Sequence, residues 1–236
     1  WCDWKLGSVD LAADELKELL GDTINSENSG TASQRRQRSS LRDEALDYLV
    51  IIFTEDRSIS AKEVYDFLAS VGGDRYSRDV LIKVAEAYFG QTEYERSSDT
   101  YRFLIGLDPD GLSAAKYQRN IVENWSAALD DVTARKEMKV LVDTYGPASA
   151  WARHQRGEEE ALAKSIAATE LLVRTTATNM HAEAQAAETR SKKIDVKLYE
   201  AAAEGYGIYL EGFGEGATAS EHAVEVRYHL ADILYF

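Results

Sequence analysis

The side chains best suited to chemistry are two histidines and two acidic residues that recur at helical spacing near the C-terminal end of the sequence. At ~100° per residue, their side chains fall on about a quarter of one helix. Imidazole and carboxylate groups suit a divalent metal, but metal sites in helical bundles take ligands from several helices. We therefore expect a polar helix face with no metal and no other cofactor. The four residues are His222, Glu225, His229 and Asp232.

Other signatures of catalysis are weak or absent. The glycine-rich stretch 212–216 has no preceding strand pattern and no following lysine, so it does not match a phosphate-binding loop. No Gly-Xaa-Ser-Xaa-Gly motif is present. The one cysteine, Cys2, excludes an intrachain disulfide and a cysteine-rich metal site, and we expect it to be buried in a packed helix. The sequence therefore predicts a protein that is not an enzyme and takes no small-molecule substrate.

The charge pattern bears on the class of partner. A formal net charge of −14 argues against a nucleic-acid-binding protein, which would carry a basic face. The one dense basic cluster, Arg35, Arg36 and Arg38, lies among Ser, Gln and Asn residues. We expect it to form a solvated loop, with contact to phosphate or acidic lipid as the alternative. No apolar run approaches the ~20 residues of a membrane span.

Helices must position these residues. Hydrophobic residues make up 44% of the chain, only two prolines interrupt it, and no alternating strand pattern is sustained. The clearest unit runs from Arg78 to Gly111, where a nine-residue step separates two apolar helical faces and Pro109 closes the second. The first face comprises Leu81, Val84, Ala85 and Tyr88, and the second comprises Ser97, Tyr101, Leu104 and Ile105.

This unit resembles the tetratricopeptide repeat, a 34-residue helix–turn–helix motif. It reproduces the spacing large-x-x-large-small-x-x-Tyr, then small-x-x-x-aromatic, then proline. Leu81 stands for the usual tryptophan, Thr92 for the turn glycine and Ser97 for the usual alanine. The nine-residue step recurs from Ile52 to Ala61 and, in a looser copy, from Trp125 to Ala134.

The resemblance implies an all-α fold, namely a right-handed α-solenoid of antiparallel helix pairs with one extra-long pair near the C-terminal end. We expect the whole chain to be one solenoid fragment from a longer array, whose flanking repeats would cover its ends. Its expected parts are a half repeat at 1–20, an insertion at 21–39, repeats at about 40–75, 78–111 and 112–147, a long helix pair at 148–213 and a half repeat at 217–236.

The long pair departs from the 34-residue period. An apolar helical stripe without proline predicts a first helix of nearly forty residues from Ser149 to about Glu188, with a break near Thr175–Thr178 as an alternative. A second helix, from about Lys192 to Glu211, is expected to pair with it.

In the tetratricopeptide family, the first helix of each pair lines a concave face that commonly grips a peptide or a helix. The resemblance therefore implies a non-catalytic scaffold or adaptor for a protein or peptide partner. The arginine and lysine clamp of members that bind C-terminal carboxylates is not evident. Aromatic residues, which interface hot spots favour, are frequent at the corresponding positions. By spacing, these positions are Trp1, Trp4, Val50, Phe53, Glu86, Phe89, Arg119, Glu123, Tyr228, Asp232 and Tyr235.

Two short segments resemble bacterial cell-envelope members of the family, namely Tyr145–Ala152 and the tryptophan-containing stretch Trp1–Gly7. They favour a multiprotein assembly for envelope construction or motility, in the periplasm or cell envelope, with the cytoplasm as the alternative. Two other functions stay open. One is a regulatory or sensor domain of a larger enzyme, and the other is a metal-dependent helical protein that uses His222, Glu225, His229 and Asp232.

Overall fold

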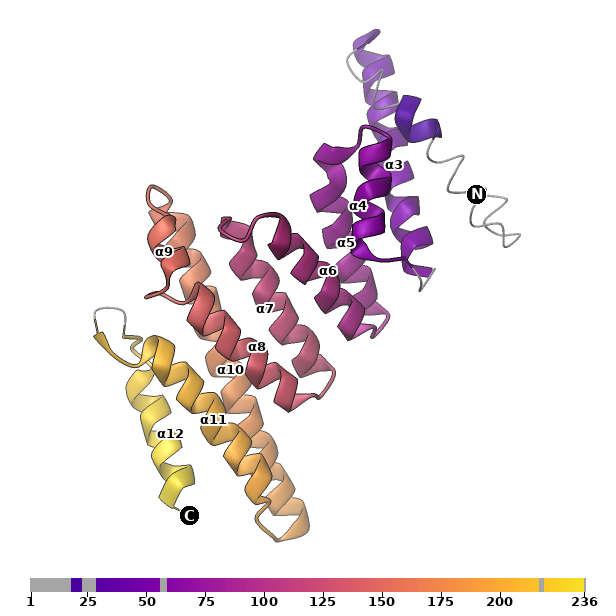
Figure 1. Ribbon diagram of the computed structural model, residues 1–236. Coiled ribbons are helices and arrows are strands. Elements are labelled where there is room, and N and C mark those ends of the chain that lie inside the picture. The colour runs from indigo at the N-terminus through magenta and orange to yellow at the C-terminus, as the bar shows by residue number, and fades with distance from the viewer. Residues whose placement is uncertain (1–17, 23–28, 56–58, 217–218, 236) are drawn as a thin grey trace. The chain divides into compact units, whose positions relative to one another are not determined.

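The computed structural model describes residues 18–22, 29–55, 59–216 and 219–235 (Figure 1). Within these ranges the protein is all-α, with about ten packed helices and no strand. The chain divides into two compact units, Trp1–Leu104 and Ile105–Phe236. The predicted all-α class is thus confirmed for the described part of the chain.

The first unit contains α3 (Ala32–Glu55), α4 (Ala61–Ser70), a 3₁₀ turn (Asp74–Tyr76), α5 (Ser77–Gly90) and most of α6 (Tyr94–Leu107). Both α3 and α4 pack against α5. The start of α4 is fixed by a capping box, in which Ser60 and Glu63 satisfy each other's backbone N–H groups. Leu49, Leu68 and Leu81 are fully buried, one from each of the three helices.

Tyr88 joins several segments of this unit through its hydroxyl group. The hydroxyl donates to the Phe53 carbonyl at 3.0 Å and accepts from Arg96 Nη2 at 3.0 Å. The Arg96 guanidinium also lies over the Tyr88 ring and donates to the Ile59 carbonyl. The tyrosine of the repeat signature therefore ties the end of α3 to α5, α6 and the chain that precedes α4.

The second unit contains α7 (Leu112–Ala127), α8 (Asp131–Tyr145), the short α9 (Ala150–His154), α10 (Glu159–Ser191), α11 (Val196–Phe213) and α12 (Ala223–Tyr235). Two helix pairs, α7 with α8 and α10 with α11, pack against one another, and α12 lies along α11 (Figure 1). Helix α11 therefore contacts three helices, α8, α10 and α12. Its buried face supplies Tyr206, Tyr209 and Phe213 to the core.

Two successive helix pairs share the same turn. At the end of α5, the Glu93 N–H donates to the Tyr88 carbonyl and Thr92 adopts a φ of 62°. At the end of α7, the Asp130 N–H donates to the Trp125 carbonyl and Leu129 adopts a φ of 56°. Both are Schellman-type helix ends with a left-handed residue, the position that glycine normally fills. Thr92 stands where the repeat signature expects its turn glycine.

Glycine allows α11 to approach its neighbours closely. A Cβ atom on Gly205 would lie 3.1 Å from Cβ and 3.3 Å from Cα of Ala177 on α10. A Cβ atom on Gly212 would lie 2.5 Å from Val142 Cγ1 on α8. The small residues of α11 therefore set its distance from both helices.

The basic cluster does not form the expected loop. Helix α3 begins at Ala32, so Arg35, Arg36 and Arg38 lie in its first two turns. The physical reason is a capping interaction, because the Thr31 N–H donates to Gln34 Oε1 and the Gln34 N–H donates to Thr31 Oγ1. The first helix of the expected repeat at 40–75 is therefore longer than the spacing predicted.

The expected first long helix is broken at a different place. The chain leaves α9 after His154, turns at Gly157 with a φ of 94°, and continues as the 33-residue α10. The alternative of a break at Thr175–Thr178 is wrong, because α10 runs without interruption from Glu159 to Ser191. None of the helices in the described ranges is long and apolar enough to cross a bilayer.

The left-handed turn at Leu129 predicts a stabilising substitution. Leu129 is 84% exposed, so replacing it with glycine loses little burial and removes the steric cost of positive φ. We expect Leu129→Gly to raise the free energy of unfolding by roughly 1 kcal/mol in urea denaturation followed by circular dichroism. Leu129→Ala keeps the cost and should leave stability unchanged. Equal effects of the two variants would contradict this description of the turn.

The close approach at Gly205 predicts a destabilising substitution. Gly205→Val places methyl groups against the backbone of Ala177, and we expect a loss of about 1–3 kcal/mol in thermal or urea unfolding. Gly207 is the matched control on the same helix, because a Cβ there meets nothing within 4 Å. Gly207→Val should change stability by less than about 0.5 kcal/mol. Valine has a higher helix propensity than glycine, so a similar loss for both variants would contradict the claim that contact with Ala177 causes the loss.

Candidate interaction surface

The structure separates the predicted partner-binding residues into buried and exposed groups. Trp1 and Trp4 lie outside the described residues. Val50 and Phe53 are buried, and the Phe53 ring meets the Phe67 ring edge-on at a centroid distance of 5.5 Å. The prediction that these two line an open groove is wrong for this structure, because their face of α3 packs into the first unit.

Glu86 and Phe89 lie on the exposed side of α5. Glu86 borders a cavity of about 500 Å³ between α3 and α5, together with Arg42, Tyr76 and other residues. Phe89 is 42% exposed and its ring packs edge-on against Tyr94. These residues remain accessible to a partner.

Arg119 is held by α10, whereas Glu123, one turn later on α7, is exposed. The Arg119 Nη1 atom lies 3.1 Å from the Ser165 carbonyl, from Ser165 Oγ and from Thr169 Oγ1. Burial lowers the pKa of Arg119, and the charge of Glu123 opposes that effect. Arg119 therefore joins α7 to α10, and only Glu123 of this pair is open to solvent.

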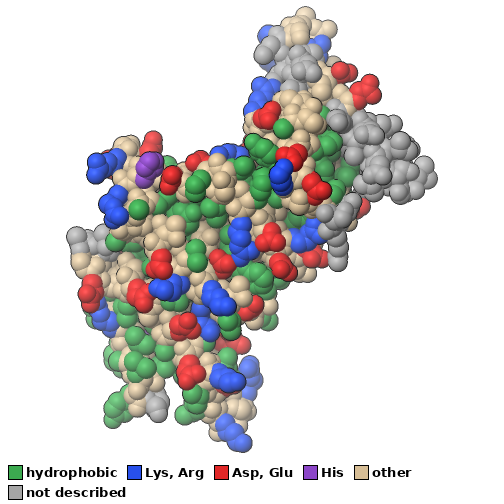
Figure 2. Space-filling view, in the orientation of Figure 1, with side chains coloured by type: hydrophobic (Ala, Val, Ile, Leu, Met, Phe, Trp, Pro, Cys, Tyr) green, Lys and Arg blue, Asp and Glu red, His purple; other side chains and the backbone are tan. Residues whose placement is uncertain are grey.

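The three predicted residues on α12 are all exposed. Tyr228, Asp232 and Tyr235 follow one another at helical spacing, and Tyr235 is 91% exposed. Val224 and Leu234 are also exposed on this helix, whereas Ala223 and Val226 face the core. Figure 2 shows hydrophobic side chains at the surface where α12 lies. Among the predicted positions that the structure describes, α12 thus carries two exposed aromatic residues, Tyr228 and Tyr235.

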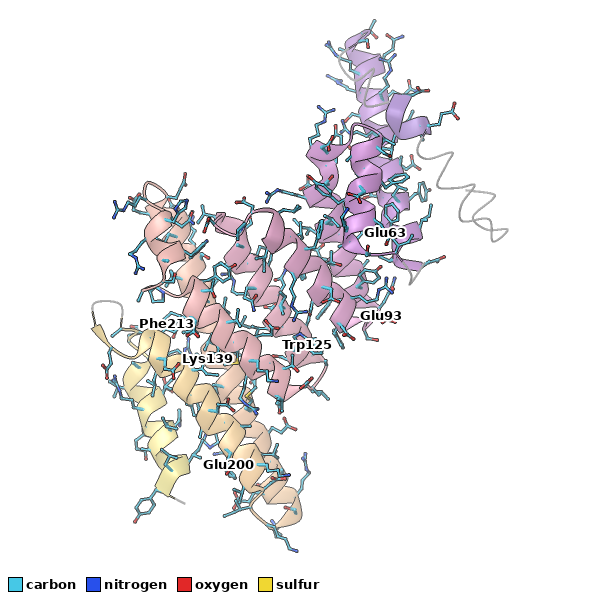
Figure 3. All side chains as sticks on the ribbon, viewed as in Figure 1. Glu63, Glu93, Trp125, Lys139, Glu200 and Phe213 are labelled. Carbon is cyan, nitrogen blue, oxygen red and sulfur yellow. The ribbon has the colours of Figure 1, made fainter. Side chains whose placement is uncertain are left out.

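A groove that the sequence did not predict lies between the first half of α10 and the residues that lead into α12. It encloses about 630 Å³. Leu162, Ala163, Ile166 and Ala167 line it from α10, and Phe213 closes it at the end of α11 (Figure 3). Glu159, Glu170 and Glu221 add three carboxylates to its lining. We call this feature the Glu170 groove.

Local interactions shape the Glu170 groove. The Ser220 N–H donates to the Phe213 carbonyl, and Arg227 donates to the Gly214 carbonyl, so Ser220 and the start of α12 are held against the end of α11. Ala163 and Ala167 are four residues apart on α10, and their small side chains leave space beside them.

Glu170 is the central polar residue of the groove. Its Oε1 atom accepts hydrogen bonds from Tyr209 at 2.6 Å, Arg174 at 3.0 Å and Ser220 at 3.1 Å. Burial alone would raise the pKa of Glu170, but these three donors together lower it. The carboxylate is therefore ionised at neutral pH and fixed in position.

The contact with Glu170 belongs to a row in which tyrosines of α11 meet ionisable residues of α10. Tyr209 bonds Glu170, Tyr206 lies 3.1 Å from His181 Nδ1, and Tyr199 donates to Glu188 at 2.6 Å. Burial, followed by the bond to Glu170, raises the pKa of Tyr209 to about 12. The bond to Glu188, followed by burial, raises the pKa of Tyr199 to about 12. All three hydroxyls therefore stay protonated over the physiological range.

Of the four residues first considered for metal binding, His222 and His229 both approach Glu225, the latter at 3.8 Å, whereas Asp232 lies elsewhere. His222 precedes α12, and its Nδ1 atom lies 3.9 Å from Glu225 Oε2. The His229 ring stacks on Tyr206 at a centroid distance of 5.8 Å, and Asp232 borders a separate cavity of about 570 Å³ near His181. Across the described ranges, no group of three or more His, Cys, Asp or Glu residues is arranged to hold a metal ion.

No protein-family model, curated protein or solved structure matches this chain. The class that the structure defines is therefore an all-α protein with an exposed aromatic helix and an acidic, apolar-lined groove.

The sequence does not predict the groove because its lining comes from four separate segments, namely residues 147–152, 159–170, 213 and 220–222. A signal was nevertheless present in α10, where Ala163, Ala167 and Glu170 follow one another at i, i+4 and i+7. Small apolar residues followed by a carboxylate on one helical face are a sequence signal for such a groove.

The environment of His181 predicts a pH dependence of stability. Burial, and then the charge of His229, lowers the pKa of His181, while Asp232 opposes the effect. Tyr206 and Tyr199 of α11 face the same ring. The unfolded chain binds a proton near pH 6.5, whereas the folded chain resists it, so stability should fall as the pH drops below about 6.5. Urea unfolding at pH 7.5 and pH 5.5 measures this loss.

His181→Gln should reduce that pH dependence, because the titrating group is removed. His154 is exposed on α9 and provides the matched control, so His154→Gln should retain the full pH dependence. If His181→Gln lost as much stability between the two pH values as the parent protein, another group would be responsible.

Proposed function

We propose that this chain forms part of a tetratricopeptide-like, right-handed α-solenoid that acts as a non-catalytic scaffold and binds a peptide or helix of a protein partner. The observation that carries the proposal is the shared turn of the helix pairs α5–α6 and α7–α8. Both pairs have helices of 14 to 16 residues and a left-handed residue at the same point of the turn.

Burial at the signature positions also supports this proposal. Leu81, Ala85 and Ser97 are fully buried in or beside α5, and Tyr88 and Tyr101 are nearly so. In the next pair, the nine-residue step ends at Ala134, which is fully buried. Small residues at such positions let neighbouring helices approach closely.

The proposed partner surface consists of the exposed residues on the first helix of each pair. Phe89 on α5 and Tyr228 and Tyr235 on α12 are exposed aromatic residues at these positions. Partly exposed aromatics are the residues on which interface energy commonly depends. A multiprotein assembly of the bacterial envelope or motility machinery is the context that we propose for such a surface.

The proposal predicts that loss of these aromatics weakens one defined partner complex. A partner is first captured from a lysate of the source organism, identified by mass spectrometry, purified and titrated against the full chain. We expect Tyr228→Ala with Tyr235→Ala to weaken binding by about tenfold or more. Phe89→Ala tests the first unit in the same way.

Leu129→Ala is the control, because Leu129 is highly exposed but lies in a turn rather than on the proposed surface. It should leave the dissociation constant unchanged. A purified partner that binds the parent, the tyrosine variant, Phe89→Ala and the control equally would contradict the proposed surface.

A further inference from the structure

The Glu170 groove has two properties that select an occupant. Its walls are largely aliphatic, from Leu162, Ile166 and the two alanines, and Phe213 closes one end. Three carboxylates, Glu159, Glu170 and Glu221, stand on the same lining, which contains no lysine or arginine. The lining also contains His222, and Glu170 is ion-paired with Arg174, so Glu159 and Glu221 supply the unbalanced negative charge. An apolar surface with an excess of negative charge is complementary to a ligand with both apolar and cationic groups.

Glu170 has the geometry of a counter-ion. All three of its hydrogen bonds end on Oε1, so Oε2 remains to accept from an incoming ammonium or guanidinium group. Its side chain is 14% exposed, which gives a partly desolvated carboxylate already held in place by the protein. Arg174 already forms an ion pair with Oε1, so a second cation would approach the carboxylate at Oε2 and share its charge with Arg174.

The groove is open to solvent, and this favours a polypeptide ligand over a small molecule that a pocket would enclose. Ala163 and Ala167 are exposed on its α10 wall. Drug-sized ligands normally bury most of their surface in a pocket, whereas a peptide lies across an open groove with its side chains as anchors. The net charge of −14 would also steer a basic segment toward the chain.

We propose that the Glu170 groove binds a segment of a partner protein in which apolar residues are interspersed with lysine or arginine. Apolar side chains of that segment pack on the partly exposed Leu162 and Ile166, and one cationic side chain pairs with Glu170. This inference rests on the proposed scaffold function and adds a defined site and the chemistry of the partner.

The probes are three synthetic peptides of 16 residues that share one leucine pattern and carry lysine, glutamine or glutamate at the remaining positions. Each is labelled with fluorescein and titrated with the full chain, with binding followed by fluorescence anisotropy. The proposal predicts the tightest binding for the lysine peptide, weaker binding for the glutamine peptide and the weakest for the glutamate peptide. Equal binding of the lysine and glutamate peptides would overturn it.

A matched pair of variants separates the groove from general electrostatic attraction. Ala167 and Ala168 are adjacent and both exposed on α10, but only Ala167 lines the groove. Ala167→Glu and Ala168→Glu add the same charge, but only the former places a larger side chain in the apolar part of the groove, where it would block the apolar anchors of the peptide. We therefore expect only Ala167→Glu to weaken binding of the lysine peptide, by about tenfold or more. If both variants bind the peptide as tightly as the parent or more tightly, attraction to net charge explains the binding and the groove proposal fails.

A second pair of variants tests whether Glu170 pairs with a cationic side chain of the peptide. Glu170→Gln keeps the size and acceptor oxygen of the side chain but removes its charge, and it should weaken binding of the lysine peptide. Glu200 is an exposed glutamate on α11, far along that helix from Phe213 (Figure 3). Glu200→Gln removes the same charge and should have no effect, and equal losses for the two variants would contradict the assignment.

The peptide experiments can fail while the test of the scaffold function succeeds, so the two proposals can be distinguished. Loss of partner binding in the Tyr228 and Tyr235 variant, together with unchanged peptide binding in Ala167→Glu and Glu170→Gln, would leave the scaffold function standing and reject the groove. Circular dichroism of each variant confirms that the helices are retained.

Discussion

The contact between α10 and α11 is the interaction on which the second unit depends. Gly205 lets the two helices approach closely, and three tyrosines of α11 then meet Glu170, His181 and Glu188 of α10. Buried hydroxyl and carboxylate groups are costly unless they are paired, so this row of contacts fixes the register of the two helices. A slide by one turn would leave each of these groups without its partner.

The candidate surfaces follow from that register. Because Tyr209 holds Glu170 through Oε1, the carboxylate stands at the groove between α10 and the segment that leads into α12. Because α12 packs on α11 through Ala223 and Val226, its tyrosines point to solvent. One packed helix, α11, therefore positions both the charged groove and the aromatic helix that we propose as partner contacts.

The sequence predicted much of the fold through small residues and turns. Ala85 and Ser97 lie on the two apolar faces of the clearest unit, Ala134 ends the looser nine-residue step, and all three are fully buried. Helix ends were harder to predict, because they depend on local bonds. The hydrogen bonds between Thr31 and Gln34 start α3 earlier than the repeat spacing predicted. The turn at Gly157 interrupts the expected long helix, whereas the sequence had indicated Thr175–Thr178 as the alternative place for a break.

The candidate site was less accessible to sequence reasoning. Repeat spacing places a residue on a helix face, but burial depends on which neighbour covers that face, and Phe53 was mispredicted for this reason. The Glu170 groove needs α10, the end of α11 and residues 220–222 together, and no local pattern encodes that combination. Tyr228 and Tyr235 are exposed on α12, and their role in partner binding stays a prediction.

The most direct test of the account is hydrogen–deuterium exchange of the full chain with and without its purified partner. We expect the bound partner to slow hydrogen–deuterium exchange of the backbone amides in residues 159–170 and 219–235, which contain the groove wall and α12. Slowed exchange confined to other segments of the described chain, with these two unchanged, would contradict the claim that this surface holds the partner.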